Sequence, residues 1–393
     1  MANDDGSAVI PLAAPAALPP VATDITAAPA ETPVAAERTS YHGRAPRTGG
    51  IVLGNALLNL VTLGFYRFWG KTRLRRYLWG NVRLWGDPVA YTGRGMELFV
   101  GFLIALAILI PISIVIGGIG FLTQGSSDLV QAGIELLTYL VFGFLIGVAL
   151  FRARRYMLSR TQWRQIRAAQ TGSSAAYGWK WLGYTVLTVV TLGLVSPVRN
   201  VALQRHLMTN TWFGDRPFTF DGRARELMGK WLLCWILALP TLGLSLLWYS
   251  AFQTRRFARF TGYENLRFEL PVTFGNLFSI YAPYLLVALL LFGGVTWIFA
   301  DTVMQVGPFL KGGTLDPGSL HGKVMGSLFA YAIVVLVVLP AIAAMMVTHR
   351  LFALVCDRLA IEGTPDFAAI AQSAHARPSS GEGLADALDV GGI

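Results

Sequence analysis

The sequence predicts a mainly α-helical, polytopic membrane protein with internal repeats, short cytoplasmic β-hairpins and a disordered N-terminal tail. Three observations predict this class. Hydrophobic residues make up 54% of the 393-residue chain and charged residues only 14%, whereas soluble proteins carry about 25% charged residues. Four apolar runs are long enough to cross a bilayer, which takes about 20 residues. A Thr-Leu-Gly triplet occurs three times, each time before a basic, aromatic segment.

The two ends of the chain differ in composition from the middle. Residues 1–47 are rich in Ala and Pro and lack helical periodicity, and Asp4 and Asp5 stand where a signal peptide needs basic residues. We therefore expect a disordered cytoplasmic tail over 1–47, a polytopic membrane domain over 48–372 and a flexible C-terminal tail over 373–393. The two cysteines, Cys234 and Cys356, form no CxxC or Cys/His cluster, so neither a disulfide framework nor a zinc site is expected.

The apolar runs fall into two kinds. Full spans are expected over residues 98–122, 129–151, 274–299 and 324–347. Shorter runs over 51–68, 177–198 and 228–251 each contain Thr-Leu-Gly, and glycine favours the end of a helix. After the second triplet, Ser196 and Pro197 are typical of a helix start. We interpret the shorter runs as helical hairpins that enter the membrane and return on one side.

The placement of the 32 Lys and Arg residues favours this interpretation. Seven full spans would place the basic loops 152–176 and 199–227 on opposite sides, against the rule that basic loops stay cytoplasmic. With hairpins, every Lys and Arg except Lys311 and Lys323 lies on one side. This predicts a bacterial inner-membrane protein with cytoplasmic termini. Kinked full spans remain the alternative. Nucleic-acid binding is not expected, because no polar basic domain exists.

A longer pattern accompanies the triplets. Arg155, Arg205 and Arg255 are 50 residues apart, and a fixed period of this size indicates a repeated structural unit. Gly-Asp at 86–87 and at 214–215 lies between short segments of β-forming residues, which predicts hairpin turns. Residues 263–270 keep the strand character without Gly-Asp. Each unit is predicted to be an apolar helix, a turn, a basic helix and a β-hairpin.

Residues 62–71, Arg75-Arg76-Tyr77, Gly80-Asn81 and Gly86-Asp87 together resemble the YjgN-like family of bacterial inner-membrane proteins. Residues 158–164 and 211–214 are also similar to stretches of that family, and the similarity covers most of residues 48–372. The family carries a domain of unknown function. The resemblance implies a polytopic inner-membrane location and no catalytic residues. Residues 301–323 depart from it, because they align with none of the repeats.

Candidate binding residues are basic and lie at repeated positions: Arg76, Arg155, Arg205 and Arg255. Arginine can hold a phosphate through two hydrogen bonds, so these residues are candidates for binding anionic lipid or another anionic ligand. Topology control and interfacial anchoring explain them more simply, although their repetition favours a ligand. Glu135, two turns into the second span, is the intramembrane polar candidate, although a place near the outer interface explains it too. Glu97, Asp301 and Lys230 lie at span edges.

No pattern in the chain predicts an enzyme, a metal site or a cofactor. Gly70-Lys71-Thr72 lacks the spacing of a phosphate loop, and no HExxH or GxSxG occurs. We expect a non-enzymatic protein that binds or transports a lipid or small solute, with anionic membrane lipids as partners. The alternatives are a structural or regulatory membrane module and a lipid-modifying membrane enzyme.

Overall fold

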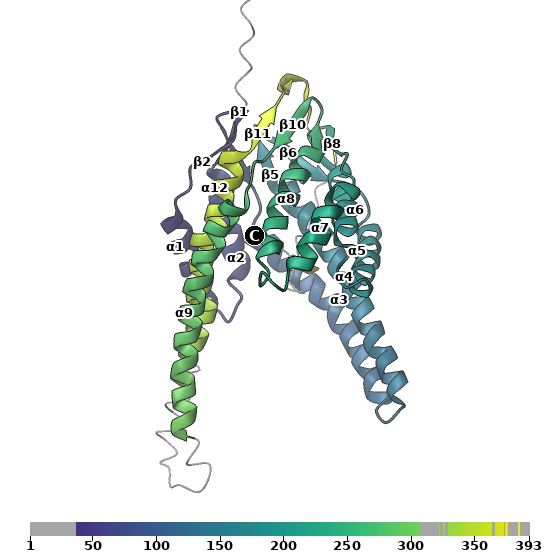
Figure 1. Cartoon of the computed structure of the whole chain (residues 1–393), viewed down its shortest axis with the longest axis vertical. Helices are drawn as coiled ribbons and strands as arrows, with labels where there is room; N and C mark the ends of the chain where they lie inside the picture. Colours follow the sequence, from purple (N-terminus) through teal and green to yellow (C-terminus); the bar gives the residue numbers. More distant parts are fainter. Residues whose placement is uncertain are drawn as a thin grey trace, which may run out of the picture. The chain divides into compact units, whose positions relative to one another are not determined.

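A pair of antiparallel helices followed by a two-stranded β-hairpin is the arrangement that recurs along the chain (Figure 1). The computed structural model describes residues 37–306, 322, 325–326, 329–363, 366–372, 374–375 and 384–385. Residues 36–393 form one compact unit, which contains every helix and strand of the described residues. Residues 1–36 of the predicted N-terminal tail, most of 373–393 and most of 301–323 lie outside the described residues, so the disorder expected there stays a prediction.

Four helix pairs are each followed directly by a β-hairpin. The helix pairs are α1 (Ala45–Val61) with α2 (Arg67–Gly80), α3 (Gly95–Leu122) with α4 (Asp128–Arg160), α5 (Ser174–Val190) with α6 (Ser196–Thr209), and α7 (Arg225–Leu237) with α8 (Leu244–Phe260). The hairpins are β3 (Val82–Leu84) with β4 (Asp87–Tyr91), β5 (Thr161–Trp163) with β6 (Ile166–Gln170), β7 (Thr211–Phe213) with β8 (Arg216–Phe220), and β9 (Thr261–Tyr263) with β10 (Leu266–Glu269).

A fifth helix pair completes the series. It consists of α9 (Phe274–Val306) and a helix over Phe329–Arg358. The second helix contains the π-helical turns η2 (Val334–Val338) and η3 (Ala344–Thr348), together with α11 (Leu339–Ala343) and α12 (His349–Arg358). Strand β11 (Ala360–Glu362) and the short 3-10 helix η4 (Phe367–Ala369) come after it.

The sequence suggested separate hairpins. In the structure the hairpins instead join into one sheet that closes on itself. In the described residues its order is β1-β11-β10-β9-β8-β7-β6-β5-β4-β3-β2. Strands β1 (Glu37–Arg38) and β2 (Ser40–Tyr41) lie at opposite ends of this order, yet only Thr39 separates them in the chain. β1 pairs with β11 and β2 with β3, both antiparallel. The N-terminal stretch thus turns the sheet into a barrel, which removes its free edges.

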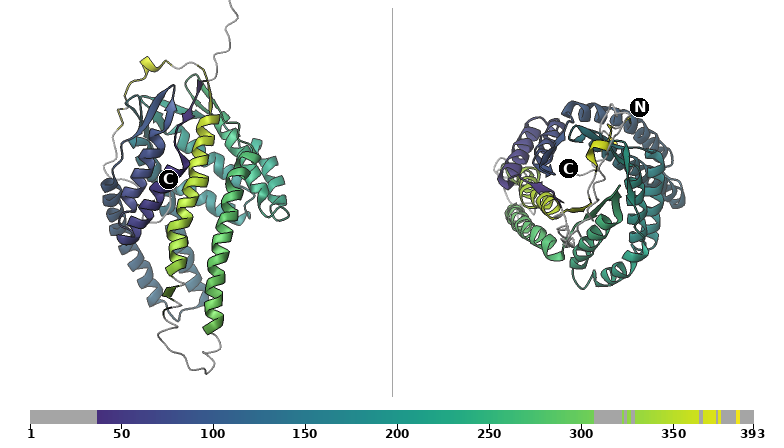
Figure 2. Two further views of the ribbon diagram at one scale, coloured as in Figure 1. Left: turned by 90° about the vertical axis from the view of Figure 1, so that its left-hand side faces the viewer. Right: turned by 90° about the horizontal axis from the view of Figure 1, so that it is seen from above.

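The helices follow the same circular order as the strands. Helix α2 packs against α3, α4 against α5, α6 against α7, and α8 against α9, while α1 packs against α11 and η3 of the last pair. Seen from above, the helices surround a common centre (Figure 2). One backbone hydrogen bond recurs between successive hairpins: His42 N to Asn81 O, Thr92 N to Arg160 O, Thr171 N to Asn210 O, and Asp221 N to Phe260 O, over 2.8–3.0 Å.

Four helices of the described residues are long and apolar enough to cross a membrane, which confirms the four predicted runs. They are Gly95–Leu122, Asp128–Arg160, Phe274–Gly294 and Phe329–Arg358. The α3–α4 pair and α9 project from the barrel (Figure 1). Where α4 meets α5, Gly147 lies so close to Gly178 that an added Cβ would come within 2.9 Å of the facing backbone. Small residues at this crossing let the two helices pack tightly.

Each Thr-Leu-Gly triplet forms the turn between two short helices. Leu63, Leu192 and Leu242 have φ values of 49–51°, and the glycine that follows each has φ of 85–90°. The three glycine amides donate to carbonyls five residues earlier, at 2.7 Å in every case, which is the bond of a Schellman turn. The leucine side chains are 76–95% exposed. Apolar tips this exposed are expected to lie in lipid.

The threonine of the triplet supports the turn through its hydroxyl group. Thr62 donates to Leu58 O at 2.7 Å and accepts from the Tyr66 amide at 3.0 Å. Thr241 makes the equivalent bonds to Leu237 O and from the Ser245 amide. Helices α5 and α6 reverse direction at this turn, so the hairpins before and after them lie on the same side. The hairpins β5–β6 and β7–β8 accordingly belong to one sheet. The structure therefore supports helical hairpins over full spans.

Two boundaries differ from the prediction. The first hairpin turns at Trp85-Gly86, with φ of 48° and 82°, whereas Asp87 is already paired with Leu84. The predicted Gly86-Asp87 turn is thus displaced by one residue, because the two-residue turn used here needs positive φ at both central positions. Gly214-Asp215 forms the turn between β7 and β8 as predicted. Residues 37–47, assigned to the tail, hold β1, β2 and the start of α1, because they close the barrel.

Candidate functional site

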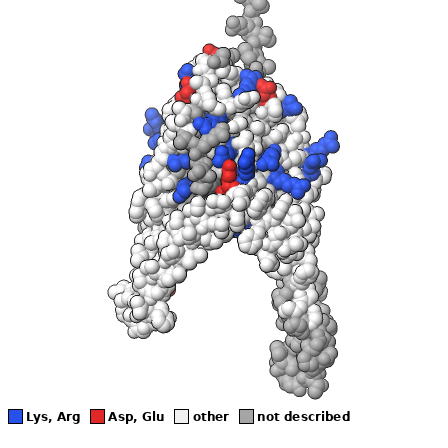
Figure 3. Space-filling model, turned by 180° about the vertical axis from the view of Figure 1, so that it is seen from behind, with Lys and Arg blue, Asp and Glu red and all other residues white. Residues whose placement is uncertain are grey.

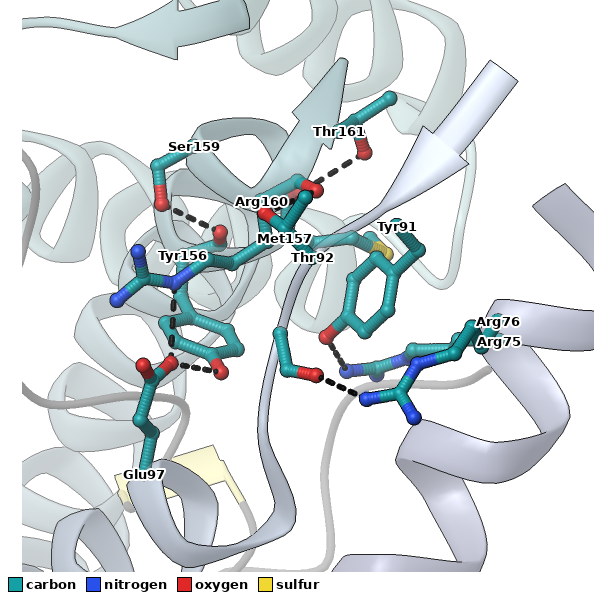
Figure 4. Close-up of polar contacts among 11 residues, drawn as sticks. Arg75, Arg76, Tyr91, Thr92, Glu97, Tyr156, Met157, Ser159, Arg160 and Thr161 are labelled. Atoms are coloured by element: carbon teal, nitrogen blue, oxygen red, sulfur yellow. Dashed lines mark hydrogen bonds and ion pairs between the residues drawn. The ribbon is translucent and has the colours of Figure 1, made fainter. Parts of the chain in front are cut away.

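Three of the four predicted arginines make the same contact. Nη2 of Arg76 donates to Gly93 O at 3.0 Å (Figure 4), and Arg155 and Arg205 donate to Gly172 O and Gly222 O. Each glycine lies 17 residues after its arginine, where the chain leaves the β-hairpin for the next helix. The repeated position therefore ties each basic helix to the following linker. Since a guanidinium has five N–H donors, this tie leaves donors over for a ligand.

The other two predicted candidates stand apart from this pattern. Arg255 occupies the equivalent place in α8 and is exposed. Glu135 is exposed in the first half of α4. Neither residue makes a hydrogen bond or ion pair within the described part of the chain. The structure therefore does not gather the predicted arginines and Glu135 into one site, and ligand binding by them stays a prediction.

A polar cluster between α3 and α4 was only partly foreseen. Glu97, predicted as a span-edge residue, accepts a hydrogen bond from the Tyr156 hydroxyl at 2.7 Å and lies 3.0 Å from Nε of Arg160 (Figure 4). The Arg160 and Glu97 side chains are 10% and 26% exposed. Tyr156 and Arg160 carry no separate signal in the sequence, because only the return of α4 alongside α3 brings them to Glu97.

Exposed basic residues encircle the molecule where the helices approach the barrel. We call this set the basic collar; every helix pair contributes to it, and it comprises Arg73, Arg152, Lys180, Lys230, Arg255 and Arg350. Figure 3 shows Lys and Arg gathered over the barrel and adjoining helix ends, with none on the described parts of the projecting helices on this face. Residues 98–151 and 274–306 contain no Lys or Arg. Among the described residues, positive charge thus lies towards one end of the long helices.

Lys180 of the collar is in direct contact with His206. Its Nζ lies 3.0 Å from Nδ1 of the histidine. Burial, and secondarily the charge of Lys180, lower the pKa of His206 from its ordinary value of 6.5. Both effects disfavour the imidazolium. The histidine is therefore kept neutral, with Nδ1 available to accept a hydrogen bond from the lysine.

A cavity of about 350 Å³ is lined by corresponding residues of successive units. Helix ends contribute Leu158, Met208 and Ala258, and strands contribute Ala168, Phe218 and Phe268. Both sets are spaced by 50 residues. Equivalent positions of units arranged in a closed ring face one common space only at the centre of the ring. We therefore call this cavity the central chamber.

The C-terminal segment (residues 366–372) covers the barrel at its turns. The ring of Phe367 lies 4.9 Å from those of Trp85 and Trp163. Ile370 is buried in a cluster with Tyr263, whose hydroxyl donates to Phe213 O at 3.0 Å. Burial, followed by the nearby charge of Glu264, raises the pKa of Tyr263 to about 12, so this phenol stays neutral and remains a donor.

Polar contacts fix the same segment at several points. The Ala371 amide donates to Oδ1 of Asp215, and Gln372 accepts from the Arg167 amide. Sequence reasoning missed this role, because it assigned the region to the end of the membrane domain without structure of its own.

No group of three or more His, Cys, Asp or Glu residues gathers in the described part of the chain. The expectation that no metal or cofactor is bound remains an expectation. The candidate sites left by the geometry are the basic collar and the central chamber.

Together, the long apolar helices, the exposed hairpin tips and the basic collar define an α-helical membrane protein whose helix pairs carry a β-barrel. A family model described as bacterial protein of unknown function (DUF898) matches residues 36–235 and 217–377, so the chain belongs to this family.

Two curated relatives are named as inner membrane proteins. The chain is 27% identical over 158 residues to inner membrane protein YjgN of Salmonella typhimurium, covering 39% of this chain and 36% of that protein. It is 26% identical over 155 residues to inner membrane protein YjgN of Escherichia coli strain K12, with the same coverage. The match thus spans little more than a third of each relative. No solved structure matches. The predicted family is confirmed, and both relatives carry the name of an inner membrane protein.

Proposed function

We propose that this protein is a non-enzymatic, multi-pass inner-membrane protein that binds anionic lipid headgroups through its basic collar. The observation that carries the proposal is the division of charge along the helices. Apolar helix surface with exposed leucine tips is followed by a band of exposed Lys and Arg from all five helix pairs. A bilayer with an anionic surface complements both features at once.

The proposal includes an orientation. The barrel, the collar and both termini face the cytoplasm, because basic residues near membrane-spanning helices are retained on that side. The loop between α3 and α4 then faces the periplasm. A cysteine-free background, with Cys234 and Cys356 replaced, allows single cysteines to be labelled by a membrane-impermeant maleimide. We expect Gln165→Cys and Asp215→Cys to be labelled only after the membrane is opened, and Ser126→Cys in intact spheroplasts. Labelling of residues 165 and 215 from opposite sides would contradict the orientation.

Lipid binding is tested on the purified full-length chain. We expect phosphatidylglycerol to raise the thermal unfolding midpoint and to remain bound in native mass spectra, whereas phosphatidylcholine does neither. Arg152→Gln, Lys180→Gln and Arg255→Gln combined should reduce retained phosphatidylglycerol several-fold, because exposed cations near a membrane contribute about 1 kcal/mol each. Arg267→Gln, an exposed position on strand β10, is the control. Equal retention of the two lipids by the unaltered protein would refute the proposal.

A further inference from the structure

The central chamber contains a cation that the protein itself does not neutralise. Arg154, from α4, is the charged residue of its lining. Its Nε is buried without a hydrogen-bond partner, and no ion pair or hydrogen bond to Arg154 exists within the described residues. The chamber's two threonines are already satisfied, because Thr211 donates to Leu207 O and Thr261 to Phe257 O. The Arg154 side chain as a whole is partly exposed, so the rest of its guanidinium is open to the cavity and to a compensating anion.

Comparison between the units shows what is special about this position. The residues 50 and 100 positions later, Gln204 and Thr254, are uncharged. In the first unit the equivalent residue is Arg75, which is buried and donates to the Tyr91 hydroxyl at 3.4 Å. In the first unit the guanidinium at this position thus has an aromatic hydroxyl as a partner. In the third and fourth units the guanidinium is absent. Only Arg154 faces the open chamber.

The residue that corresponds to Tyr91 in the second unit is Gln170. Its side chain is buried, and both its Oε1 and its Nε2 lack hydrogen-bond partners. The first unit shows that these two positions face each other, since Arg75 and Tyr91 are in contact. The second unit therefore places an unsatisfied amide next to Arg154, although Gln170 itself is not part of the chamber lining. N–H donors from both groups are the donors that a carboxylate or phosphate oxygen accepts from.

We propose that the central chamber binds a small amphipathic anion, with its carboxylate or phosphate group on Arg154 and its apolar body along the phenylalanine-lined wall. The volume of about 350 Å³ lies at the lower end of the range for small-molecule sites. Phe213, Phe218 and Phe268 supply the apolar wall. This site is separate from the basic collar, because none of the collar residues lines the chamber.

The first experiment uses radiolabelled decanoate as the probe, in equilibrium dialysis of the full-length protein in a non-ionic detergent with protein-free micelles as the blank. We expect saturable binding of one decanoate per chain. Decanol, which lacks the charge, and inorganic phosphate, which lacks the tail, should compete at least tenfold less well. Equal competition by phosphate would show a bare anion site instead, and equal competition by decanol would show a merely apolar one; either result overturns the proposal.

Variants then place the anion at Arg154. Arg154→Gln introduces the residue found at the equivalent position of the next unit, and we expect it to weaken decanoate binding at least tenfold. Gln170→Leu should weaken binding to a smaller extent. Arg267→Gln, an exposed arginine on strand β10 outside both the chamber and the collar, is the matched control and should bind as the unaltered protein does. Decanoate binding that is unchanged in Arg154→Gln would overturn the proposal.

Stability separates this interpretation from a purely structural pair of Arg154 and Gln170. Without ligand, Arg154→Gln removes a cation that has no counter-charge among the described residues, so its thermal unfolding midpoint should equal or exceed that of the unaltered protein. If instead the two side chains satisfied each other, Arg154→Gln and Gln170→Leu would each lower the midpoint, and the unaltered protein would not bind decanoate. Should Arg154→Gln fail to fold, the proposal is wrong about the cation, and Arg154→Lys reports whether charge alone retains binding. The collar variants should leave decanoate binding unchanged.

Discussion

The indole nitrogen of Trp235 donates a hydrogen bond to the carbonyl oxygen of Leu192 over 2.9 Å, and so ties α7 to the hairpin tip of the preceding unit. Trp231, one turn earlier, donates to Gly193 O at 3.0 Å. Both acceptors belong to the Thr-Leu-Gly turn, where the helix has ended. Gly193 O also accepts from the amide and the hydroxyl of Ser196. In a bilayer such groups must be satisfied by protein, because lipid tails offer no hydrogen bonds.

Replacing both tryptophans with phenylalanine tests this tie. Trp231→Phe and Trp235→Phe together retain the apolar bulk and remove two donors. Leu192 O is then left without a partner, whereas Gly193 O keeps Ser196, so we expect a total loss of about 1–3 kcal/mol of stability. The midpoint of thermal unfolding in detergent measures the loss. Trp297→Phe is the control, since Trp297 is 76% exposed on α9. A double variant as stable as this control would show that the two bonds contribute nothing.

Truncation of the N-terminus tests the closure of the barrel. Removing residues 1–35 leaves β1 and β2 intact and should leave the unfolding midpoint unchanged. Removing residues 1–41 deletes both strands and exposes the edges of β3 and β11, which invites pairing between molecules. We expect the longer deletion to lower the midpoint and to produce oligomers in size-exclusion chromatography. Equal behaviour of the two deletions would show that β1 and β2 are dispensable.

The ion pair of Glu97 and Arg160 should stabilise the packing of α3 on α4. Glu97→Gln removes the carboxylate in contact with the Arg160 side chain, which is only 10% exposed, so we expect a loss of about 3 kcal/mol. Adding Arg160→Gln to that variant should recover part of the loss, because the guanidinium is removed together with the carboxylate it faced. A double-mutant cycle measured by denaturant unfolding gives the coupling energy. Strict additivity of the two substitutions would mean that the pair is not coupled.

The lowered pKa of His206 predicts a loss of stability on the acidic side. Because folding depresses the pKa below 6.5, protons bind the unfolded chain more readily than the folded one as the pH falls below that value. The stability contributed by neutral His206 is therefore complete above about pH 6.5 and decreases as the pH falls towards the lowered native pKa. Unfolding midpoints between pH 7.5 and 5 should fall less steeply in His206→Gln. Parallel profiles for the two proteins would assign the acid sensitivity elsewhere.

Local features of the chain were predictable because they follow from local chemistry. The four long helices required only apolar runs of sufficient length, and the hairpin tips required only a glycine with the threonine before it. The turn at Gly214-Asp215 was found where its residues predicted it, whereas that at Trp85-Gly86 was displaced, since a tryptophan with positive φ is uncommon. The repeated arginines were identified as equivalent, and three of them do share one contact.

The candidate sites divide in the same way. The basic collar follows from where Lys and Arg stand relative to apolar runs, which the sequence shows directly. The unpaired Arg154 of the chamber has no such signal, because it matters only once the fold has placed it against the cavity. Glu97 could be noticed as a carboxylate at a span edge, but its partner Arg160 lies 63 residues away.

By itself, the sequence determined that this is a membrane protein, which segments are apolar and where its charge lies, since solvent preference is a property of each segment. Only the tertiary structure decided that the hairpins form a closed barrel, that residues 37–41 complete it and that a chamber with an unpaired arginine lies within. The physical reason is that ring closure depends on a few backbone hydrogen bonds between strands up to 324 residues apart, as in Glu37 with Ile361. Backbone N–H and C=O groups occur in nearly every residue, so the side chains of β1 and β11 do not predict these hydrogen bonds.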